Sequence, residues 1–279
     1  MRVITMKKIT NKSFDEERAL YASSDVKLEN CRFDGAADGE SALKESHGVS
    51  ADECFFNLRY PFWHVEGFEI SRSHLTELCR APLWYSRDGV ISDSRLVAPK
   101  ALRECGNIKI DNCEINSAEF GWFCNDIKMS DCQTEGSYFM LRSSRLDFSN
   151  VRLNGKYSFQ YISDCIFENC DFDTKDAFWH AKNVIVRNSR VSGEYLGWYC
   201  ENVTFENCVL SGTQPLCYCR GLRLINCEMH GADLAFEKSD VDATITTPVI
   251  SIKNPTSGRI KVPSATIIRD DENSKCVIE

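Results

Sequence analysis

A repeat of 19 residues is the feature of this sequence that most restricts its fold. The pattern apolar-x-apolar-x-Asn-Cys-x-apolar recurs along the chain, as in VKLENCRF from Val26, IKIDNCEI from Ile108 and VTFENCVL from Val203. When successive repeats are aligned on the Cys position, the distance from one repeat to the next is 19 residues everywhere between Ser94 and Ala265. A register kept over such a length indicates a solenoid, in which each coil packs only on its neighbours.

Two fold classes compete for this repeat, because its first half also matches the strand of a leucine-rich repeat. A leucine-rich repeat is completed by a helix or 3₁₀ segment, whereas each coil here is completed by a short, aromatic, β-prone run such as DAFWHA or EYLGWY. We therefore predict an all-β, single-stranded, right-handed parallel β-helix of about 13 coils, with three short strands and three bends in each coil.

The repeat extends over almost the whole chain, which predicts one domain over residues 1–279. The segments 1–13 and 266–279 fall outside the repeat and are predicted to be irregular caps. Two short insertions are expected, one around residues 36–39 and one around residues 78–81, where the step between coils exceeds 19 residues.

The Asn and the Cys of each repeat are interpreted as structural. Asn tolerates the left-handed conformation that a bend between strands needs, and stacked Asn amides can hydrogen-bond from coil to coil. Ser, Val, Thr and Ala replace Cys in its column, which is typical of a small core residue rather than a nucleophile. The 15 cysteines are expected to be reduced, and their spacing predicts no metal site.

All five tryptophans fall into one column of the repeat. It directly follows a column that is apolar or Gly throughout, from Leu20 to Ala235, and that is expected to face the core. We therefore expect the tryptophan column to face outward, from Tyr21 through Cys217 to Phe236, and the next column, from Ala22 to Glu237, to continue a strip of Trp, Tyr, His, Arg and acidic residues.

Three interpretations of this strip are open. It is a covered aromatic ladder, a contact surface for a protein partner or a second copy, or a groove in which sugar rings stack on aromatic faces. The candidate binding residues are Lys44, Trp63, Trp84, Trp122, Trp179, Trp198 and Tyr199.

Catalysis on the strip is a further hypothesis, because glycoside hydrolysis needs two carboxyl groups about 5–10 Å apart and elimination from a uronic acid needs a base. The candidate catalytic residues are Glu45, His64, Arg103 and Glu104 in one group, and Asp176 and His180 in another. The leading functional prediction is a binding or scaffold module that presents the strip to a protein or a glycan, with self-association as one possibility. A carbohydrate-active enzyme is the alternative.

The composition of the chain restricts the classes of partner that are expected. The formal net charge of −8 and the pI near 5.3 disfavour nucleic acid. The first residues lack an apolar signal region, and no apolar run reaches membrane-spanning length, so a cytoplasmic location without membrane attachment is expected. No cofactor is predicted.

Several motifs carry a family resemblance. They include DGESALKES from Asp38, YPFWH from Tyr60, KDAFWHAKNV from Lys175 and SGEYLGWYCENVTFENC from Ser192. With these motifs the chain resembles a bacterial family of pectin-lyase-like, single-stranded right-handed β-helix proteins of unknown function. The resemblance implies the fold and no activity. Its DGES-type segment lies at the first insertion, where Asp38, Glu40, Lys44 and Glu45 are expected to cluster at the rim of the strip, either as a functional loop or as a cap.

Overall fold

The structure is a computed structural model, and it describes residues 6–37 and 39–279. The chain folds as the predicted right-handed parallel β-helix, and its described part contains a single short helix, the 3₁₀ helix η1 (Glu77–Cys79), at the second predicted insertion. The chain divides into two compact units, unit 1 up to Gly136 and unit 2 from Ser137 to Glu279.

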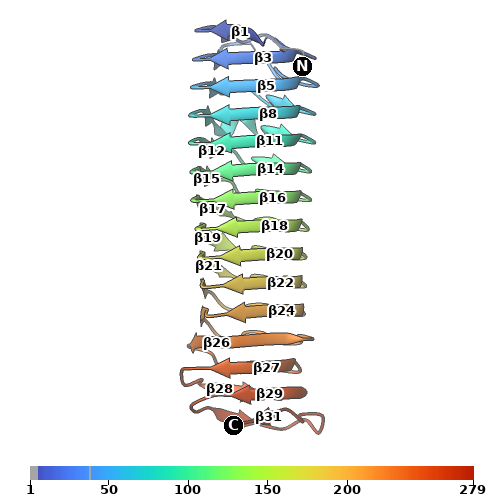
Figure 1. Ribbon diagram of the computed structural model, residues 1–279, viewed down its shortest axis with the longest axis vertical. Coiled ribbons are helices and arrows are strands. Elements are labelled where there is room, and N and C mark those ends of the chain that lie inside the picture. The colour runs from blue at the N-terminus through green and yellow to red at the C-terminus, as the bar shows by residue number, and fades with distance from the viewer. Residues whose placement is uncertain (1–5, 38) are drawn as a thin grey trace, which may run out of the picture. The chain divides into compact units, whose positions relative to one another are not determined.

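Unit 1 stacks coils of up to three strands, all paired in parallel (Figure 1). Its long strands are β1 (Lys7–Thr10), β3 (Ser24–Glu29), β5 (His47–Asp52), β8 (Glu66–Ser71), β11 (Arg87–Ser92), β14 (Gly106–Asp111) and β16 (Asn125–Ser130). The second strands are β2 (Ser13–Phe14), β4 (Arg32–Phe33), β6 (Phe55–Phe56), β9 (His74–Leu75), β12 (Arg95–Val97), β15 (Glu114–Asn116) and β17 (Gln133–Ser137). The third strands are β7 (Phe62–Trp63), β10 (Leu83–Trp84) and β13 (Leu102–Arg103).

Unit 2 repeats the long and second strands, but most of its coils have a turn in place of the third strand. Its long strands are β18 (Ser144–Ser149), β20 (Ser163–Glu168), β22 (Lys182–Arg187), β24 (Glu201–Glu206), β26 (Leu222–His230), β27 (Asp240–Ile245), β29 (Ser257–Lys261) and β31 (Val277–Ile278). The second strands are β19 (Arg152–Lys156), β21 (Asp171–Lys175), β23 (Arg190–Ser192) and β25 (Val209–Ser211). β28 (Ser251–Lys253) and β30 (Thr266–Ile268) pair with each other in a separate sheet, which a bridge from Ile252 joins to Ala235. The expectation of three strands in every coil is therefore wrong for most coils of this unit.

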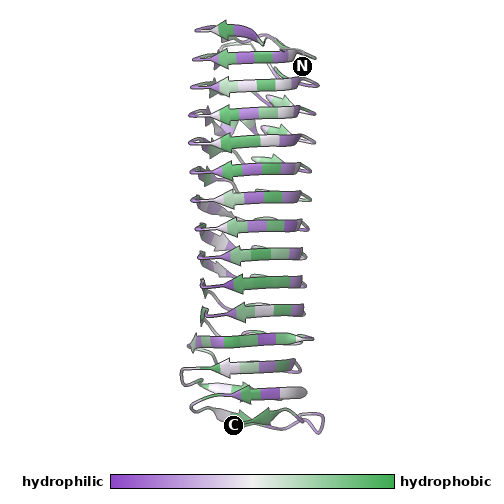
Figure 2. Ribbon diagram, in the orientation of Figure 1, coloured by the Kyte–Doolittle hydropathy of each residue, from purple (hydrophilic) through white to green (hydrophobic). Residues whose placement is uncertain are grey.

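The alternation of apolar and polar residues explains each long strand (Figure 2). In β14, Ile108 and Ile110 are buried while Lys109 between them is exposed, as the two-residue period of a strand requires. Ile108 pairs with Ile127 of the next coil, so the 19-residue repeat is the pairing register itself. Like residues therefore stack on like residues and form a continuous core.

The predicted Asn bend is confirmed. Asn112 follows β14 with a left-handed φ of 49°, and its side-chain amide donates to the Asp93 carboxylate at 2.7 Å. The amide of Asn226 donates in the same way to Asn207 at 2.9 Å in unit 2. These bonds join successive coils at the turn between the long and second strands.

The cysteines of the repeat column are buried core residues, as predicted, and all 15 cysteines of the chain are buried free thiols. Burial raises the pKa of Cys54 to about 12 and the pKa of Cys170, in the same column, to about 11. A thiol that stays protonated at neutral pH is a poor nucleophile and a poor metal ligand. The geometry therefore agrees with a packing role for this column.

The repeat loses its register near the C-terminus. A shift in the pairing of β26 with β27 places Ile245, rather than Thr246, opposite Cys227, and Thr246 is exposed. At the N-terminus, β1 pairs with β3 and lies within the segment 1–13 that was expected to be irregular. Regular pairing thus begins earlier than the sequence pattern indicated.

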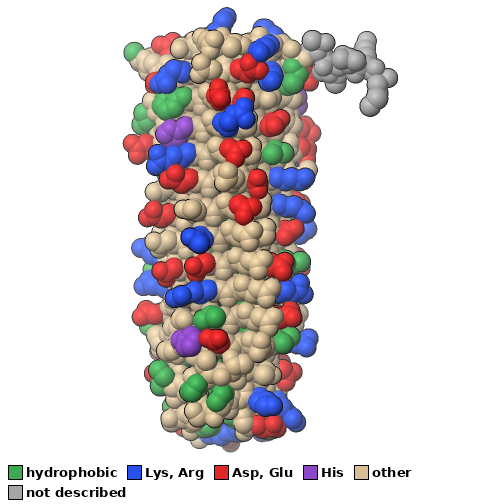
Figure 3. Space-filling model, turned by 60° about the vertical axis from the view of Figure 1, so that its left-hand side comes forward, with side chains coloured by type: hydrophobic (Ala, Val, Ile, Leu, Met, Phe, Trp, Pro, Cys, Tyr) green, Lys and Arg blue, Asp and Glu red, His purple; other side chains and the backbone are tan. Residues whose placement is uncertain are grey.

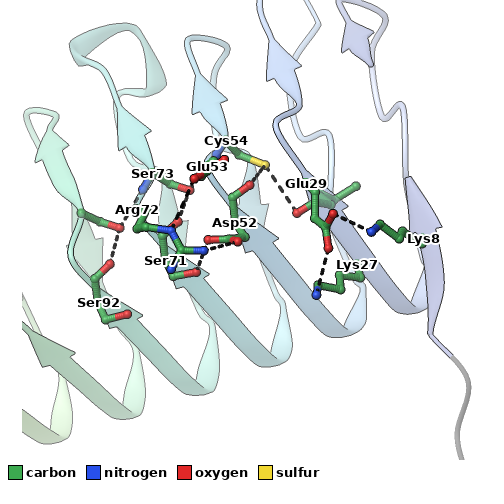
Figure 4. Close-up of polar contacts among 12 residues, drawn as sticks. Lys8, Lys27, Glu29, Asp52, Glu53, Cys54, Ser71, Arg72, Ser73 and Ser92 are labelled. Atoms are coloured by element: carbon green, nitrogen blue, oxygen red, sulfur yellow. Dashed lines mark hydrogen bonds and ion pairs between the residues drawn. The ribbon is translucent and has the colours of Figure 1, made fainter. Parts of the chain in front are cut away.

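The polar surface is held together by pairs of residues on neighbouring coils. Acidic and basic side chains are interspersed on the face shown in Figure 3, and no large area of that face carries one sign only. Figure 4 shows one such group, in which Arg72 pairs with Asp52 while Ser71 donates to the same carboxylate at 2.7 Å. Such exposed pairs each contribute little, roughly 0–1 kcal/mol.

Candidate functional site

The predicted strip consists of two parallel rows in each unit, which we name the inner row and the turn row. The inner row follows the core column and contains Tyr21, Lys44, Trp63, Trp84, Arg103 and Trp122 in unit 1, and Leu141, Gln160, Trp179, Trp198, Cys217 and Glu237 in unit 2. The turn row comes next and contains Ala22, Glu45, His64, Tyr85, Glu104 and Phe123 in unit 1, and Arg142, Tyr161, His180, Tyr199, Tyr218 and Lys238 in unit 2.

Two residues expected to face outward are instead buried. One coil contains an extra residue, which shifts the register and places Phe236 in the core column. Glu237 therefore lies in the inner row, and its carbonyl oxygen accepts a hydrogen bond from the Tyr218 N–H, as the carbonyl of Trp198 does from His180. Cys217 remains in the inner row, but its short side chain does not reach solvent and its Sγ lies 3.6 Å from the carbonyl oxygen of Gln214. The tryptophans themselves are half-buried.

In unit 1 the inner row from Lys44 to Trp122 is a stack of three indole rings and two cations. The Lys44 ammonium lies 4.5 Å from the centre of the Trp63 ring, which stacks on Trp84 at 5.7 Å. The Arg103 guanidinium lies between two rings, 5.7 Å from the centre of Trp84 and 5.2 Å from that of Trp122. Cation–π attraction therefore contributes to each of these contacts.

In unit 2 the inner row contains a pair of indole rings. Trp179 stacks on Trp198 with 5.3 Å between ring centres and 5° between ring planes. The indole N–H groups donate to the carbonyl oxygens of Tyr195 and Gln214, at 2.7 and 2.8 Å respectively. Both rings are therefore fixed in orientation.

The turn row of unit 2 is an unbroken stack of four aromatic rings. Successive ring centres from Tyr161 through His180 and Tyr199 to Tyr218 lie 4.7, 5.0 and 4.9 Å apart, with planes within 13° of parallel. The Arg142 guanidinium lies 4.7 Å from the centre of the Tyr161 ring and closes one end of the stack. Tyr161 and Tyr199 are nevertheless 44% and 45% exposed.

The backbone holds these residues in a conformation that the sequence did not reveal. Tyr161, His180 and Tyr199 have left-handed φ angles of 58°, 57° and 60°. Their N–H groups donate to inner-row carbonyl oxygens of the next coil, for example from His180 to Trp198 at 2.9 Å. The left-handed conformation costs an ordinary residue about 1–2 kcal/mol, so the stacking and these hydrogen bonds must offset it.

Stacking decides which part of each ring is available to a ligand. Each interior ring of the turn row is covered on both faces by its neighbours, so its edge is what solvent contacts. Burial and the Glu237 charge raise the pKa of Tyr218, which keeps its hydroxyl protonated and able to donate at neutral pH. The row therefore offers ring edges and polar tips rather than open ring faces.

The structure spreads the first predicted catalytic group over several coils. Glu45 accepts a hydrogen bond from the Tyr21 hydroxyl at 2.6 Å, His64 stacks on Tyr85 at 4.8 Å, and Glu104 lies 3.7 Å from Arg103. The backbone register puts three coil steps, about 14 Å, between Glu45 and Glu104. These two carboxyl groups are thus farther apart than glycoside hydrolysis needs, and the catalytic role of the group stays a prediction.

The second predicted group is also not joined by a direct contact. Asp176 is 8% exposed, and His180 lies between the rings of Tyr161 and Tyr199. Burial raises the pKa of Asp176, the Glu194 charge adds to the rise, and Lys175 opposes it. In the part of the chain that the structure describes, no hydrogen bond or ion pair connects Asp176 with His180, and their catalytic role likewise stays a prediction.

Replacement of Asp176 by Asn should stabilise the protein at neutral pH. A carboxyl whose pKa is raised by folding carries a penalty above the folded pKa, and the penalty disappears below the unfolded value of about 3.9. Urea unfolding should therefore show a higher free energy of unfolding for Asp176→Asn at pH 7, with a difference that shrinks as the pH approaches 4. A variant less stable than the wild type at pH 7 would contradict this account.

A pocket of about 460 Å³ opens beside the inner row of unit 1. Tyr60, Ala81, Trp84 and Pro99 give it apolar walls, and Arg80, Lys100 and Arg103 give it positive charge. Of these residues the sequence prediction named only Trp84 and Arg103. The insertion at residues 78–81 was the available signal for Arg80.

Of the cluster predicted at the first insertion, the structure shows a contact only between Lys44 and Glu45 among the described residues. Glu40 pairs with Arg59 at 3.3 Å, whereas Lys44 lies over Trp63 and 3.9 Å from Glu45. Asp38 lies outside the described residues.

A second column of small buried residues also escaped the sequence analysis. It follows the turn row and contains Ser46, Ser86, Cys105, Cys124, Cys200 and Cys219. Ser86 shows its role, since its hydroxyl donates to the Phe62 carbonyl at 2.9 Å and accepts from the Val65 N–H at 3.0 Å. This column helps to hold the turn row beside the core.

Two findings concern features that the described residues lack. Within residues 6–37 and 39–279, no three His, Cys, Asp or Glu side chains are grouped so that they could hold a metal ion. Nor does that part of the chain contain a helix that is long and apolar enough to span a membrane.

The fold and the two rows define a parallel β-helix protein with an aromatic-lined face. Over residues 7–278 the chain matches the DUF3737 family, described as proteins of unknown function, and it belongs to that family. No curated protein sequence matches it.

Among solved structures, the A-module of the Azotobacter vinelandii mannuronan C-5 epimerase AlgE4 covers 86% of this chain and 91% of its own length, at 11% identity and a TM-score of 0.34. The catalytic domain of a GH87 alpha-1,3-glucanase covers 86% of this chain and 63% of its own, at 10% identity and a TM-score of 0.37. PfbA, a surface adhesin of Streptococcus pneumoniae, covers 88% of this chain and 62% of its own, at 13% identity and a TM-score of 0.30.

Proposed function

We propose that the protein is a binding module that receives another protein on the turn row of unit 2. The observation that carries this proposal is the stack from Tyr161 to Tyr218, whose rings are fixed against one another while Tyr161 and Tyr199 remain 44% and 45% exposed. Exposed apolar side chains gathered in one row are typical of interaction surfaces.

The composition and rigidity of the row favour a protein partner. Tyr and Arg are enriched among the residues that contribute most to protein interfaces, and Arg142 continues the stack of tyrosines. Rings that are already stacked lose little side-chain entropy on binding, which lowers the cost of association by about 0.5–1.5 kcal/mol for each immobilised side chain.

The covered ring faces do not favour the carbohydrate alternative. A sugar ring stacks on an open aromatic face, and the faces of His180 and Tyr199 are occupied on both sides by neighbouring rings. The edge and the hydroxyl of a tyrosine suit the side chains and backbone groups of a protein, which donate and accept hydrogen bonds beside an apolar contact.

The test is site-specific photo-cross-linking in the cells that make the protein. A benzophenone amino acid replaces Tyr199 in one variant and Ile166 of β20 in the control, because Ile166 is 43% exposed and lies outside both rows. We expect a discrete product with another protein from position 199 and none from position 166. Cross-linked products of equal yield at both positions, or no product at either, contradict the proposal. A product that contains two copies of this chain would also contradict it, because it would show that the turn row mediates self-association rather than binding of another protein.

A further inference from the structure

The pocket in unit 1 differs from the rest of the molecule in its charge. Arg80, Lys100 and Arg103 converge on it, in a chain whose net charge is −8. The nearby acids are Glu119, which lies 3.4 Å from Lys100 and 3.7 Å from Arg103, and Glu104. Two carboxylates therefore face three cations, and the mouth of the pocket carries an excess positive charge.

Arg80 differs from Lys100 and Arg103 in its surroundings. Within residues 6–37 and 39–279, no carboxylate lies at ion-pair distance from its guanidinium, and the residue is exposed. Its position follows from the second insertion, since Arg80 ends η1 with a left-handed φ of 56° and its carbonyl accepts the Lys100 N–H at 3.0 Å. The insertion thus adds a cation where a regular coil would continue.

Arg103 also keeps unused hydrogen-bonding capacity. Its Nε and Nη1 atoms are buried and have no hydrogen-bond partner among the described residues. The ion pairs to Glu104 and Glu119 measure 3.7 Å, which is too long for a hydrogen bond. Because these two atoms do not reach solvent, a ligand oxygen would contact the part of the guanidinium that lines the pocket, and guanidinium groups bind carboxylate and phosphate oxygens strongly.

The remaining walls are apolar and firmly held. Tyr60 contacts Trp63 edge-on at 5.8 Å and lies 6.3 Å from Trp84, while Trp84 is fixed between Trp63 and Arg103. Pro99 adds a rigid apolar surface. The pocket has the size of a small-molecule site, for which volumes of about 300–1,000 Å³ are usual.

We propose that this pocket binds a small ring-bearing oxyanion, in which a carboxylate or phosphate group contacts Arg80, Arg103 and Lys100 while the ring lies against Tyr60, Trp84 and Pro99. The site is separate from the turn row of unit 2, and the two proposals stand or fall independently. Carboxylate and phosphate share the chemistry that the three cations recognise, and the choice of probe distinguishes them.

Isothermal titration calorimetry with matched probes tests the proposal. The charged probes are 4-hydroxybenzoate and glucose 6-phosphate, and the neutral ones are 4-hydroxybenzamide and glucose. We expect at least one charged probe to bind, at least tenfold more tightly than its neutral counterpart. The charged probe that binds identifies the oxyanion, and failure of both charged probes at millimolar concentration overturns the proposal.

Charge-reversed variants locate the binding. Arg80→Glu should weaken the charged probe at least tenfold, whereas Lys109→Glu, an exposed residue of β14 that makes the same change in net charge, should alter it less than twofold. Circular dichroism and thermal melting show that both variants are folded, and Arg80→Ala supplies an intermediate case. If Arg80→Glu and Lys109→Glu lost affinity for the charged probe equally, the loss would result from the change in net charge, and the assignment of the pocket as the binding site would be overturned.

Discussion

Replacement of Phe178 by alanine should lower the free energy of unfolding by about 3–5 kcal/mol, the usual cost of removing a fully buried aromatic ring. Phe178 is 0% exposed and stacks on Phe159 at 5.0 Å, with Phe167 and Phe205 at 5.8 and 6.3 Å. These rings come from neighbouring coils of unit 2, and they are too closely packed to fill the space left by Phe178. The loss therefore combines missing apolar burial with a cavity in the core.

Urea denaturation followed by far-ultraviolet circular dichroism measures this loss. The matched control is Ile166→Ala, since Ile166 is an apolar residue of the same unit but is 43% exposed. We expect the control to lose less than about 1 kcal/mol, as is usual for surface substitutions. A loss below about 1 kcal/mol for Phe178→Ala would show that the aromatic core is not packed as described.

Replacement of Gly212 by alanine should cost more than about 2 kcal/mol, through backbone strain and steric overlap together. Gly212 has a φ of 130°, and an added Cβ would lie 2.1 Å from the carbonyl oxygen of Gly193 in the preceding coil. The contacted atom belongs to the backbone of a paired strand region, so relief requires the two coils to separate.

Gly231 provides the control for Gly212. Its φ is 63°, but an added Cβ would have no atom within 4 Å. Gly231→Ala should therefore show strain alone, about 1–2 kcal/mol. Thermal melting of both variants separates the two contributions, and equal melting temperatures would argue against the close approach of the coils at Gly212.

The 19-residue repeat predicted the fold because register and sequence period are the same quantity in a parallel β-helix. Each coil must place like residues opposite like residues, as Ile108 opposite Ile127, so the core column, the Asn bend and the cysteine column were all predictable. The insertion at residues 78–81 was predictable too, from the longer step in the repeat, although its 3₁₀ helix η1 was not.

The conformation of the turn row was not predictable from the same pattern. Period two assigns a residue to one side of a strand, but it does not show that the strand has ended. Tyrosines such as Tyr161 and Tyr199 favour strands rather than left-handed turns. Only the hydrogen bonds between coils reveal the turn. The extra residue before Phe236 was hidden for a similar reason, since Ala235 and Phe236 both suit the core.

The pocket of unit 1 was beyond sequence reasoning for a different reason. Tyr60, Arg80 and Lys100 belong to three coils and lie in neither the inner row nor the turn row, so the analysis of those two columns did not bring them together. They meet because an insertion displaces Arg80 from the regular coil. Irregularity, rather than repetition, produces this site.

The measurement that bears most directly on the turn row is the affinity of the cross-linked partner for Tyr199→Ala, compared with Ile166→Ala. The two side chains are almost equally exposed, at 45% and 43%, but only Tyr199 belongs to the stack. A loss of at least tenfold for Tyr199→Ala, with less than a twofold change for Ile166→Ala, is the predicted result. Equal affinity of the two variants would contradict the assignment of the turn row as the binding surface.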